Sequence, residues 1–301
     1  MGKHGIGIDI GGTKTAVALV SAQGQIVDKI TMATEPTRGF ADFLTRLHNL
    51  YQQLLTRLGV SSFPIIGVAA PGPLNLAQGL MYDSPNLHWG EIPLVSQLEK
   101  TFKAPIILQN DATAAAYAEY RFGAGKGSQC MVYITISTGI GGGAVIAGRL
   151  FTGSIGNGAE FGHIPLVPNG PVCGCGQAGC WEACASGTAI ARKAEKLLGR
   201  KASAREVGAA FFAGEGWAQE LLVETANCSG QAVAIIAQNF DPDCLVFGGG
   251  VAVGLGTAYL ELIKKRAMAA SANLRLAEPK FTLAGLKGDS ALVGAAALTL
   301  A

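Results

Sequence analysis

The chain has 301 residues, of which 49% are hydrophobic and 15% charged, and its formal net charge at pH 7 is +2. This length allows two modest domains, and the apolar share predicts a folded protein. The near-neutral charge, without any lysine- or arginine-rich block, argues against a nucleic-acid-binding protein, and no apolar run is long enough to span a membrane.

The first ten residues do not read as a secretory signal, because their apolar run is short and contains Asp9. We therefore expect a cytoplasmic protein. In that reducing compartment, clustered cysteines are expected to bind metal or to do redox work more often than to form disulfides.

The first third of the chain reads as strands and turns followed by helix-linked strands. Apolar residues recur at helical spacing between Phe40 and Leu58, and an alanine-rich helix follows the second of two short buried strands. The predicted strands are 6–10, 15–20, 26–33, 64–70 and 104–109, and the predicted helices are 40–58 and 110–122.

A second cycle of the same order begins at residue 130. Two strands joined by a glycine loop come first, then an irregular glycine-rich span, then helices around one more buried strand. The predicted strands are 130–136, 142–151 and 244–250, and the predicted helices are 187–199, 203–213, 217–239, 254–270 and 289–300.

This repeated alternation predicts the α/β class, with both faces of each sheet covered. The glycine-rich segment 122–128 is the expected junction. It divides the chain into a smaller α/β domain, 1–122, and a larger one, 123–288.

The segment DIGGTK places Asp9 at the end of a strand, next to two glycines. Backbone amides at Gly11 and Gly12 can approach an anion closely, and Thr13 and Lys14 can contact phosphate. Asp9 is suited to hold hydrated Mg²⁺ near phosphates. An ordinary hairpin remains the alternative.

Two further glycine loops follow buried strands. STGIGGG carries Thr138, Gly139 and Gly141, and FGGGV carries Gly249 and Gly250. STGIGGG fits a dinucleotide-binding pattern, but a strand rather than a helix is expected after it, so we prefer a phosphate-binding hairpin. Three such loops at strand ends predict a nucleotide site, and none has the Walker-type spacing.

Asn110 and Asp111 lie where a strand meets a helix. Asp111 is equally suited to cap the helix or to act as a base toward an alcohol nucleophile. Phosphoryl transfer needs such a base mainly to orient the hydroxyl.

The cysteine-rich segment after residue 160 has the spacing of a metal site. His163 is followed by Cys173, Cys175 and Cys180, and a Cys₃His set is a common structural zinc shell. Separate buried thiols or redox thiols are the alternative. Cys184 lies outside the pattern, and we expect it to be a small buried residue.

Eight motifs in this order resemble the ROK family (repressors, open reading frames and kinases), in particular its glucokinase-type sugar kinases. They span nearly the whole chain: DIGGTK, APGPLN, SPNLHW, NDATAAAYAE, STGIGGG, GAEFGH, CGCGQAGCWE and FGGGV. The resemblance implies two lobes of the actin-like (ribonuclease H-like), hexokinase-like fold closing over a cleft, with the helix 289–301 completing the first lobe. It also implies a homodimer or homotetramer.

The same resemblance implies roles for individual residues. Asp111 would be the catalytic base that orients the 6-hydroxyl of a hexose toward the γ-phosphate of Mg·ATP. The first two glycine loops would bind the ATP phosphates, and Gly249 and Gly250 would lie near the adenosine. The sugar would be bound by Asn86, Asn110, Asp111, Glu160, His163 and Glu182, and zinc by His163, Cys173, Cys175 and Cys180.

The substrate is left open by these motifs. The segments APGPLN and SPNLHW look like glucokinases, whereas QNDATAAAYAEY and the cysteine segment also resemble N-acetylmannosamine kinases, and fructokinases share most of the set. A sugar-responsive repressor is the alternative from another class. We expect a kinase rather than a repressor, because such repressors carry a helix-turn-helix ahead of the DIGGTK segment, which here begins at Asp9.

Overall fold

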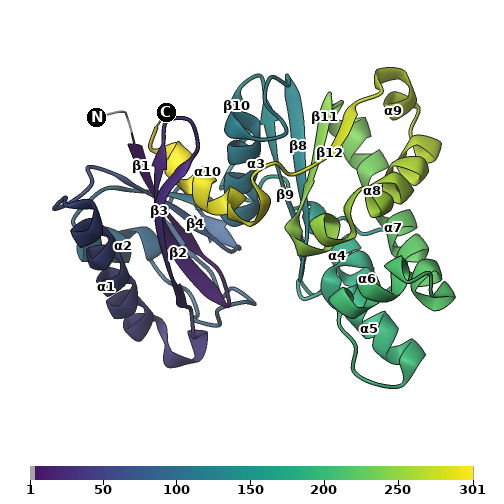
Figure 1. Cartoon of the computed structure of the whole chain (residues 1–301), viewed down its shortest axis with the longest axis horizontal. Helices are drawn as coiled ribbons and strands as arrows, with labels where there is room; N and C mark the ends of the chain where they lie inside the picture. The colour runs from purple at the N-terminus through teal and green to yellow at the C-terminus, as the bar shows by residue number, and fades with distance from the viewer. Residues whose placement is uncertain (1–3, 301) are drawn as a thin grey trace. The chain divides into compact units, whose positions relative to one another are not determined.

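The computed structural model describes residues 4–300 and divides into two compact units (Figure 1). The first unit holds the described residues up to Phe122, together with Leu150–Ala159 and those from Asp289 onward. The second holds Gly123–Arg149 and Glu160–Gly288. Residues 150–159, expected in the second domain, are grouped with the first unit. The reason is local, since Ile155 O accepts a hydrogen bond from Leu76 N at 2.9 Å.

The first unit is built on a five-stranded sheet. Its strand order is β3-β2-β1-β4-β7, in which β1, β2 and β3 are antiparallel neighbours and β4 and β7 extend the sheet parallel to β1. The strands are β1 (His4–Ile10), β2 (Lys14–Ser21), β3 (Ile26–Ala33), β4 (Ile66–Ala70) and β7 (Ile106–Asn110). A two-stranded hairpin, β5 (Leu74–Asn75) with β6 (Leu80–Met81), lies outside this sheet.

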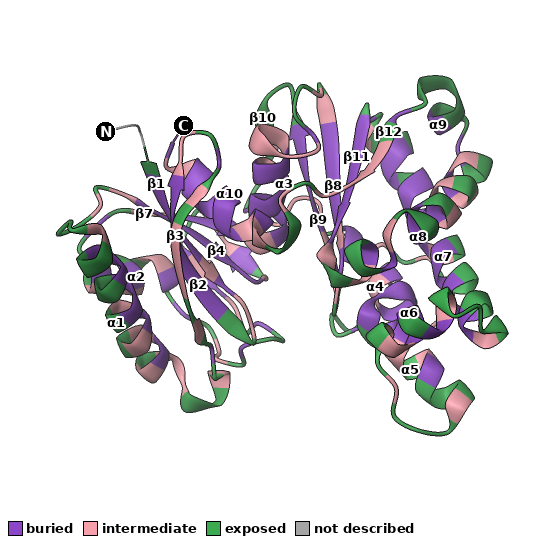
Figure 2. Ribbon diagram, viewed as in Figure 1, coloured by how far each residue is buried: buried purple, intermediate pink, exposed green. Residues whose placement is uncertain are grey.

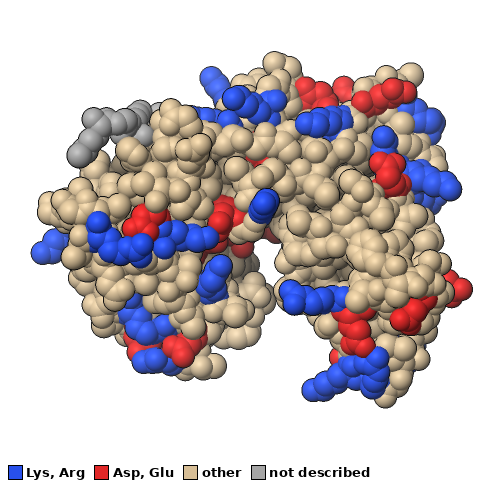
Figure 3. All heavy atoms as spheres, in the orientation of Figure 1, with Lys and Arg blue, Asp and Glu red and all other residues tan. Residues whose placement is uncertain are grey.

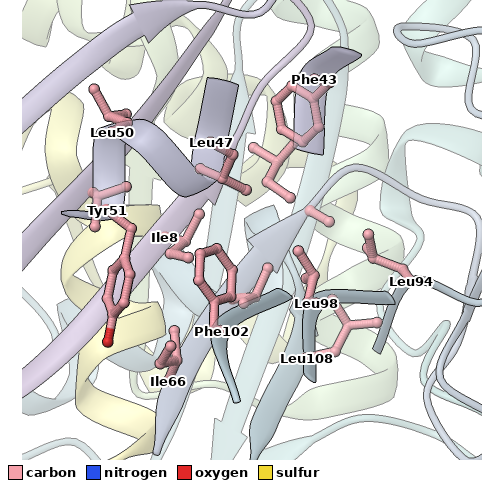
Figure 4. Packing of buried hydrophobic residues seen from close by; sticks show 14 of the residues in the cluster. Ile8, Phe43, Leu47, Leu50, Tyr51, Ile66, Leu94, Leu98, Phe102 and Leu108 are labelled. Atoms are coloured by element: carbon pink, nitrogen blue, oxygen red, sulfur yellow. The ribbon is translucent and has the colours of Figure 1, made fainter. Parts of the chain in front are cut away.

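Helices α1 (Phe40–Leu58) and α2 (Leu94–Phe102) pack against this sheet because their apolar residues fall on one side. The core in Figure 4 joins Phe43, Leu47 and Tyr51 of α1 with Phe102 of α2 and Ile8 of β1, all buried. The helices are α1 (Phe40–Leu58), α2 (Leu94–Phe102), α3 (Asp111–Phe122) and α10 (Ser290–Leu298), with a 3₁₀ turn η1 (Pro36–Arg38). The bounds predicted for α1 are confirmed, whereas α2 was not predicted.

The second unit repeats the topology of the first. Its sheet order is β10-β9-β8-β11-β12, with β9 antiparallel to β8 and with β11 and β12 parallel to β8. The strands are β8 (Cys130–Ile136), β9 (Ile140–Ile146), β10 (Arg149–Phe151), β11 (Cys244–Gly248) and β12 (Lys280–Leu283). The predicted α/β class with two similar cycles is therefore confirmed.

One strand predicted in this unit is wrong. Residues 142–151 form parts of two strands, β9 and β10, because Ala147 and Gly148 both have positive φ, 49° and 79°. Two consecutive residues with positive φ make the tight turn that joins antiparallel strands. The apolar run concealed this turn, because alanine is an unusual residue in such a position.

Helices and 3₁₀ turns cover the rest of the second unit. The helix predicted from residue 254 begins earlier, at Gly249, and kinks at Gly256, whose φ is 64°. Strand β12 and helix α9 were not predicted. The elements are η2 (Phe161–His163), α4 (Trp181–Ala185), α5 (Gly187–Leu198), α6 (Ala204–Phe212), α7 (Gly216–Phe240), α8 (Gly249–Ala270), α9 (Ala272–Ala277) and η3 (Lys287–Asp289).

Burial and charge follow the expected pattern in both units. Buried residues concentrate in the strands and on helix faces toward each sheet, while outward turns are exposed (Figure 2). Basic and acidic side chains are interspersed on the face drawn in Figure 3. Among residues 4–300, no helix has the length and apolarity needed to cross a membrane.

Candidate functional site

Two carboxylates meet at one edge of the first sheet. Because β1, β4 and β7 are parallel, their carboxyl ends lie together, and the register pairs Asp9 with Ala69 and Ala70 with Asn110. Asp9 near the end of β1 and Asp111 at the start of α3 are therefore neighbours.

Their proximity is visible in the electrostatics of Asp9. Burial, with the negative charge of Asp111 as the next contribution, raises the pKa of Asp9 from 3.8 to about 7, although Lys14 opposes the shift. A partly buried carboxylate whose anion is disfavoured in this way is suited to bind a cation.

The DIGGTK segment forms the tight hairpin expected of it. Gly11 N donates to Lys14 O at 3.1 Å, and the hairpin joins β1 to β2. A Cβ on Gly12 would lie 3.0 Å from both the Cβ and the backbone oxygen of Asn86. The packing at Gly12 is therefore close, and it brings Asn86 next to the hairpin.

Asn110, and not Asp111, makes the main side-chain cap of helix α3. Its Oδ1 accepts hydrogen bonds from Ala112 N at 2.9 Å and Thr113 N at 3.2 Å. Asp111 Oδ1 accepts one from Ala112 N at 2.7 Å, within the first turn of the helix. Because Asn110 already caps the helix, capping alone does not explain why an aspartate stands at position 111.

The two glycine loops of the second unit lie beside each other. The first follows β8, and the second begins α8 after β11, whose Gly248 pairs with Thr135. Gly249 has φ 86°, and a Cβ there would lie 2.4 Å from Ile136 O. Only glycine permits both this backbone conformation and this contact.

Glu182 connects the first of these loops to the cysteine segment. Its Oε2 accepts a hydrogen bond from Ile140 N at 2.9 Å, and its Oε1 lies 3.8 Å from Cys173 Sγ. The preceding residue, Trp181, is fully buried and donates from Nε1 to Ser229 Oγ at 3.1 Å. This anchor on α7 fixes the start of α4 and therefore the Glu182 carboxylate.

The cysteine segment folds back on itself so that four donors converge. One ligand atom from each of His163, Cys173, Cys175 and Cys180 lies within 4.8 Å of the other three. Gly176 and Gly179 make turns with positive φ, 89° and 75°, as the glycine spacing suggests. Cys184 lies outside the cluster and is buried in α4.

The geometry of this cluster fits a tetrahedral zinc ion. Zinc–sulfur bonds of about 2.3 Å and zinc–nitrogen bonds of about 2.0 Å place tetrahedral ligand atoms about 3.5–3.8 Å apart. Cys175 Sγ and Cys180 Sγ are 3.6 Å apart, as are Cys173 Sγ and His163 Nδ1. The donor chemistry therefore fits zinc, and two of the six donor pairs have the tetrahedral spacing.

His163 and Glu160 extend from this cluster toward the glycine loop of β8 and β9. His163 Nε2 lies 4.0 Å from Glu160 Oε2, while its Nδ1 faces the thiols. Burial raises the pKa of Glu160, and the nearby His163 opposes that rise. Gly162 packs so closely that a Cβ there would lie 2.0 Å from Ile140 O.

Each unit thus brings together its own share of the predicted site residues. The first unit joins Asn86, Asn110 and Asp111 with the hairpin residues Asp9, Gly11, Gly12, Thr13 and Lys14. The second joins Glu160, His163 and Glu182 with the zinc set and with Thr138, Gly139, Gly141, Gly249 and Gly250.

Three residues at these loops were missed by sequence reasoning. Asp289 contributes to the raised pKa of Asp9, and Thr34 and Thr188 bind carbonyl groups of the glycine loops. Each is separated from its loop by many residues along the chain, so no local spacing could have identified it.

Comparison with known proteins gives one consistent result. The ROK family matches residues 5–301. Glucokinase of Streptomyces coelicolor is 35% identical over 279 residues, which are 86% of this chain and 86% of that protein. N-acetylmannosamine kinase of Escherichia coli is 40% identical over 265 residues, again 86% of each.

A solved structure with ligands is also similar. It is the crystal structure of a ROK family glucokinase from Streptomyces griseus in complex with glucose and AMPPNP. The TM-score is 0.83 and the sequence identity 33%, with 98% of this chain and 99% of that chain covered.

Proposed function

The chain belongs to the ROK family, and we propose that it phosphorylates a hexose at the 6-hydroxyl with ATP, giving sugar 6-phosphate and ADP. The observation that carries this proposal is the Asp111 carboxylate at the same sheet edge as Asp9 and its glycine hairpin. That arrangement provides a group for the acceptor hydroxyl next to a site for metal-bound phosphate.

In the proposed reaction, Asp111 orients the 6-hydroxyl and accepts its proton as the bond to the γ-phosphorus forms. The bond to the leaving oxygen of ADP breaks in line with this attack. Asp9 would hold the Mg²⁺ that accompanies ATP, and this ion would neutralise charge on the phosphates. Amides of the glycine loops, with Thr13, Lys14 and Thr138, supply the remaining donors to phosphate.

The sugar is assigned to polar groups in both units. Asn86, Asn110 and Asp111 form the set from the first unit, and Glu160, His163 and Glu182 form the set from the second. Asn110 contributes its Nδ2 group, since its Oδ1 is engaged by the helix. Glu182 holds the glycine loop with Oε2, and its Oε1, which lies 3.8 Å from Cys173 Sγ, is the oxygen assigned to the sugar.

We also propose that the Cys₃His cluster binds one structural zinc ion. Support comes from the four converging donors and from the two donor pairs that lie 3.6 Å apart, as tetrahedral zinc requires. His163 then has two roles, with Nδ1 directed to the metal cluster and Nε2 toward the sugar. A reducing, cytoplasmic compartment belongs to this proposal, because the thiols must stay unoxidised.

The experiment that tests the function is a coupled ADP-release assay with Mg·ATP over a panel of sugars. The panel contains glucose, mannose, fructose, N-acetylglucosamine and N-acetylmannosamine. We expect glucose to give the highest kcat/KM. ADP release with none of these sugars would refute the proposed function.

N-acetylmannosamine is the second candidate substrate. The observation that favours it is the 40% identity to N-acetylmannosamine kinase, compared with 35% to glucokinase. A kcat/KM for N-acetylmannosamine at least tenfold above that for glucose would assign this activity instead. Polyphosphate in place of ATP provides the donor control. Assembly as a homodimer or homotetramer stays a prediction, to be tested by light scattering.

A further inference from the structure

Carbonyl groups of two glycine loops are held by threonines from other elements. Thr34, which follows β3, binds the hairpin between β1 and β2. Thr188, in the first turn of α5, binds the loop between β8 and β9. In each case the threonine donates hydrogen bonds to loop carbonyl oxygens from both its hydroxyl and its backbone N–H.

The Thr34 contacts are buried. Its Oγ1 donates to Gly11 O at 2.6 Å, and its N donates to Thr13 O at 2.9 Å. A second hydroxyl, that of Thr15, lies 2.9 Å from Thr34 Oγ1. Because Thr34 donates its own proton to Gly11, Thr15 is the donor to Thr34, and both side chains are fully buried.

The Thr188 contacts are exposed, and they converge on one carbonyl group. Thr188 Oγ1 donates to Thr138 O at 2.8 Å, and Thr188 N donates to the same oxygen at 3.2 Å. The adjacent Gly187 N donates to Ser137 O at 2.7 Å. Two successive carbonyl groups of the loop are therefore fixed by the start of α5.

Fixing these carbonyl groups also fixes the amides that follow them. In a planar trans peptide, the C=O and the next N–H point in opposite directions. With Gly11 O directed to Thr34, Gly12 N–H points away from Thr34. With Thr138 O directed to Thr188, Gly139 N–H likewise points away. Within residues 4–300, neither N–H has a protein acceptor.

We propose that Thr34 and Thr188 are positioning residues that orient the amides of Gly12 and Gly139 toward the phosphates of the nucleotide. This inference rests on the proposed function, because it assigns the two loops to ATP. Peptide groups next to glycine rotate more freely than others, so an unbraced loop would populate orientations in which the amide faces away from the phosphates. The two threonines remove that freedom before the nucleotide binds.

Substitution of the exposed threonine gives the cleaner test. Thr188→Val keeps the side-chain shape and the backbone N–H but removes the hydroxyl donor. We expect its Kd for Mg·AMPPNP, measured by isothermal titration calorimetry, to rise about three- to tenfold, as the loss of one neutral hydrogen bond would give. The KM for ATP should rise and kcat fall, while the KM for the sugar stays within about twofold. Thr188→Ser, which retains the hydroxyl, should restore Mg·AMPPNP affinity.

Thr34→Val and Thr34→Ser form the matched pair for the first unit, with the same direction expected. Thr56→Val is the control, since Thr56 makes a hydroxyl-to-carbonyl bond on α1, to Gln52 O at 3.0 Å, and takes no part in either loop. If Thr34→Val fails to fold, the comparison of Thr188→Val with Thr188→Ser still tests the inference.

The inference is overturned if Thr188→Val keeps the wild-type Kd for Mg·AMPPNP and the wild-type kcat. It is also overturned if nucleotide and sugar affinities fall equally, or if serine does not restore binding, since either result indicates general disruption of the fold. Wild-type protein that binds no Mg·AMPPNP would instead refute the proposed function. The wild type is measured first, so this outcome is distinguished from a failure of the inference about the threonines.

Discussion

Asp9 and Asp111 share one sheet edge but differ in their local partners. Asp9 is surrounded by other acids, with Lys14 as the opposing charge, and its pKa rises to about 7. Asp111 lies at the N-terminus of α3, where aligned peptide dipoles favour its ionised form. The two side chains are thus suited to different tasks, Asp9 to binding a cation and Asp111 to accepting a proton.

Asp111→Asn tests the proposed base directly. The amide has the same shape but cannot accept the proton, so we expect kcat to fall by roughly 10²-fold or more. Sugar affinity, measured by calorimetry, should change little because the amide still hydrogen-bonds a hydroxyl. Turnover near the wild-type rate would show that another group accepts the proton.

Asp9→Asn tests the effect of pH on stability. The folded-state pKa of Asp9 is raised above its ordinary value of 3.8, so its favourable contribution to stability is present below about pH 4 and is lost as pH rises through about 7. The asparagine side chain does not titrate, so the variant does not lose stability in this way as pH rises. Without nucleotide or Mg²⁺, we expect its stability relative to wild type to increase from pH 5 to pH 8, by on the order of 2 kcal/mol.

Urea unfolding of both proteins at pH 5 and at pH 8 measures this difference. A stability difference that does not change with pH would contradict the raised pKa. Mg·AMPPNP provides a separate control, because wild type should gain stability from it at pH 8 and Asp9→Asn should gain much less.

At the scale of elements, short segments that carry proposed ligand residues are held in position by contacts with longer helices. Helix α4 is five residues long, yet buried Trp181 anchors it to α7. Cys180 and Glu182 flank this anchor, so one attachment fixes both a proposed metal ligand and a proposed sugar ligand. The same elements lead into α5, which carries Thr188.

Cys175→Ala tests the role of the metal cluster. Removing one thiolate from the Cys₃His set should lower the zinc content well below the expected value of about one per chain. Because His163 and Glu182 are held by the same fold, sugar affinity and thermal stability should fall together. Elemental analysis, calorimetry and thermal unfolding give the three readouts.

Cys184→Ala is the matched control for that variant. Cys184 is buried in α4 but lies outside the cluster, so its variant should retain zinc even if it loses some stability. Carefully purified wild-type protein without zinc would refute the metal assignment.

Helix α10 packs against its neighbours without intervening side chains at several glycines. A Cβ on Gly294 would lie 1.9 Å from Ala114 O, and one on Gly67 would lie 1.8 Å from Ala295 O. We expect Gly294→Ala to destabilise the protein by about 1–3 kcal/mol or more, because backbone must move to admit the methyl group. Denaturant unfolding measures the change.

Gly254→Ala tests a helical glycine that, unlike Gly294, has no close neighbour. Gly254 lies in α8 with no atom within 4 Å of an added Cβ, so alanine should stabilise by roughly 0.5–1 kcal/mol through helix propensity. If both alanine variants changed stability in the same direction, close packing of α10 would not be the reason for Gly294.

For the whole molecule, surface charge distinguishes a sugar kinase from a DNA-binding repressor. The net charge is +2, and basic and acidic side chains are interspersed on the face that Figure 3 draws. Non-specific DNA binding depends on clustered cations that release counterions. We therefore expect no gel shift of DNA fragments at physiological salt with about 1 µM protein. A shift that weakens steeply with added salt would favour the repressor alternative.

The sequence alone determined those features that depend on local pattern or on fixed spacing. The bounds of α1 follow from its apolar period, the hairpin after β1 from its paired glycines, and the Cys₃His set from its spacing. It also determined the family, because eight motifs occur in order along the chain.

Only the tertiary structure decided which distant residues meet. The parallel register of β1, β4 and β7 brings Asp9 to Asp111, and packing of the cysteine segment on the β8–β9 loop brings Glu182 to Ile140. Hydrogen bonds from Ala112 N and Thr113 N identify Asn110 as the cap of α3. Contacts between residues far apart in the chain identify Thr34 and Thr188. The physical reason is that sequence periodicity encodes which face of an element is buried, whereas strand register and the closeness of packing depend on all of the elements together.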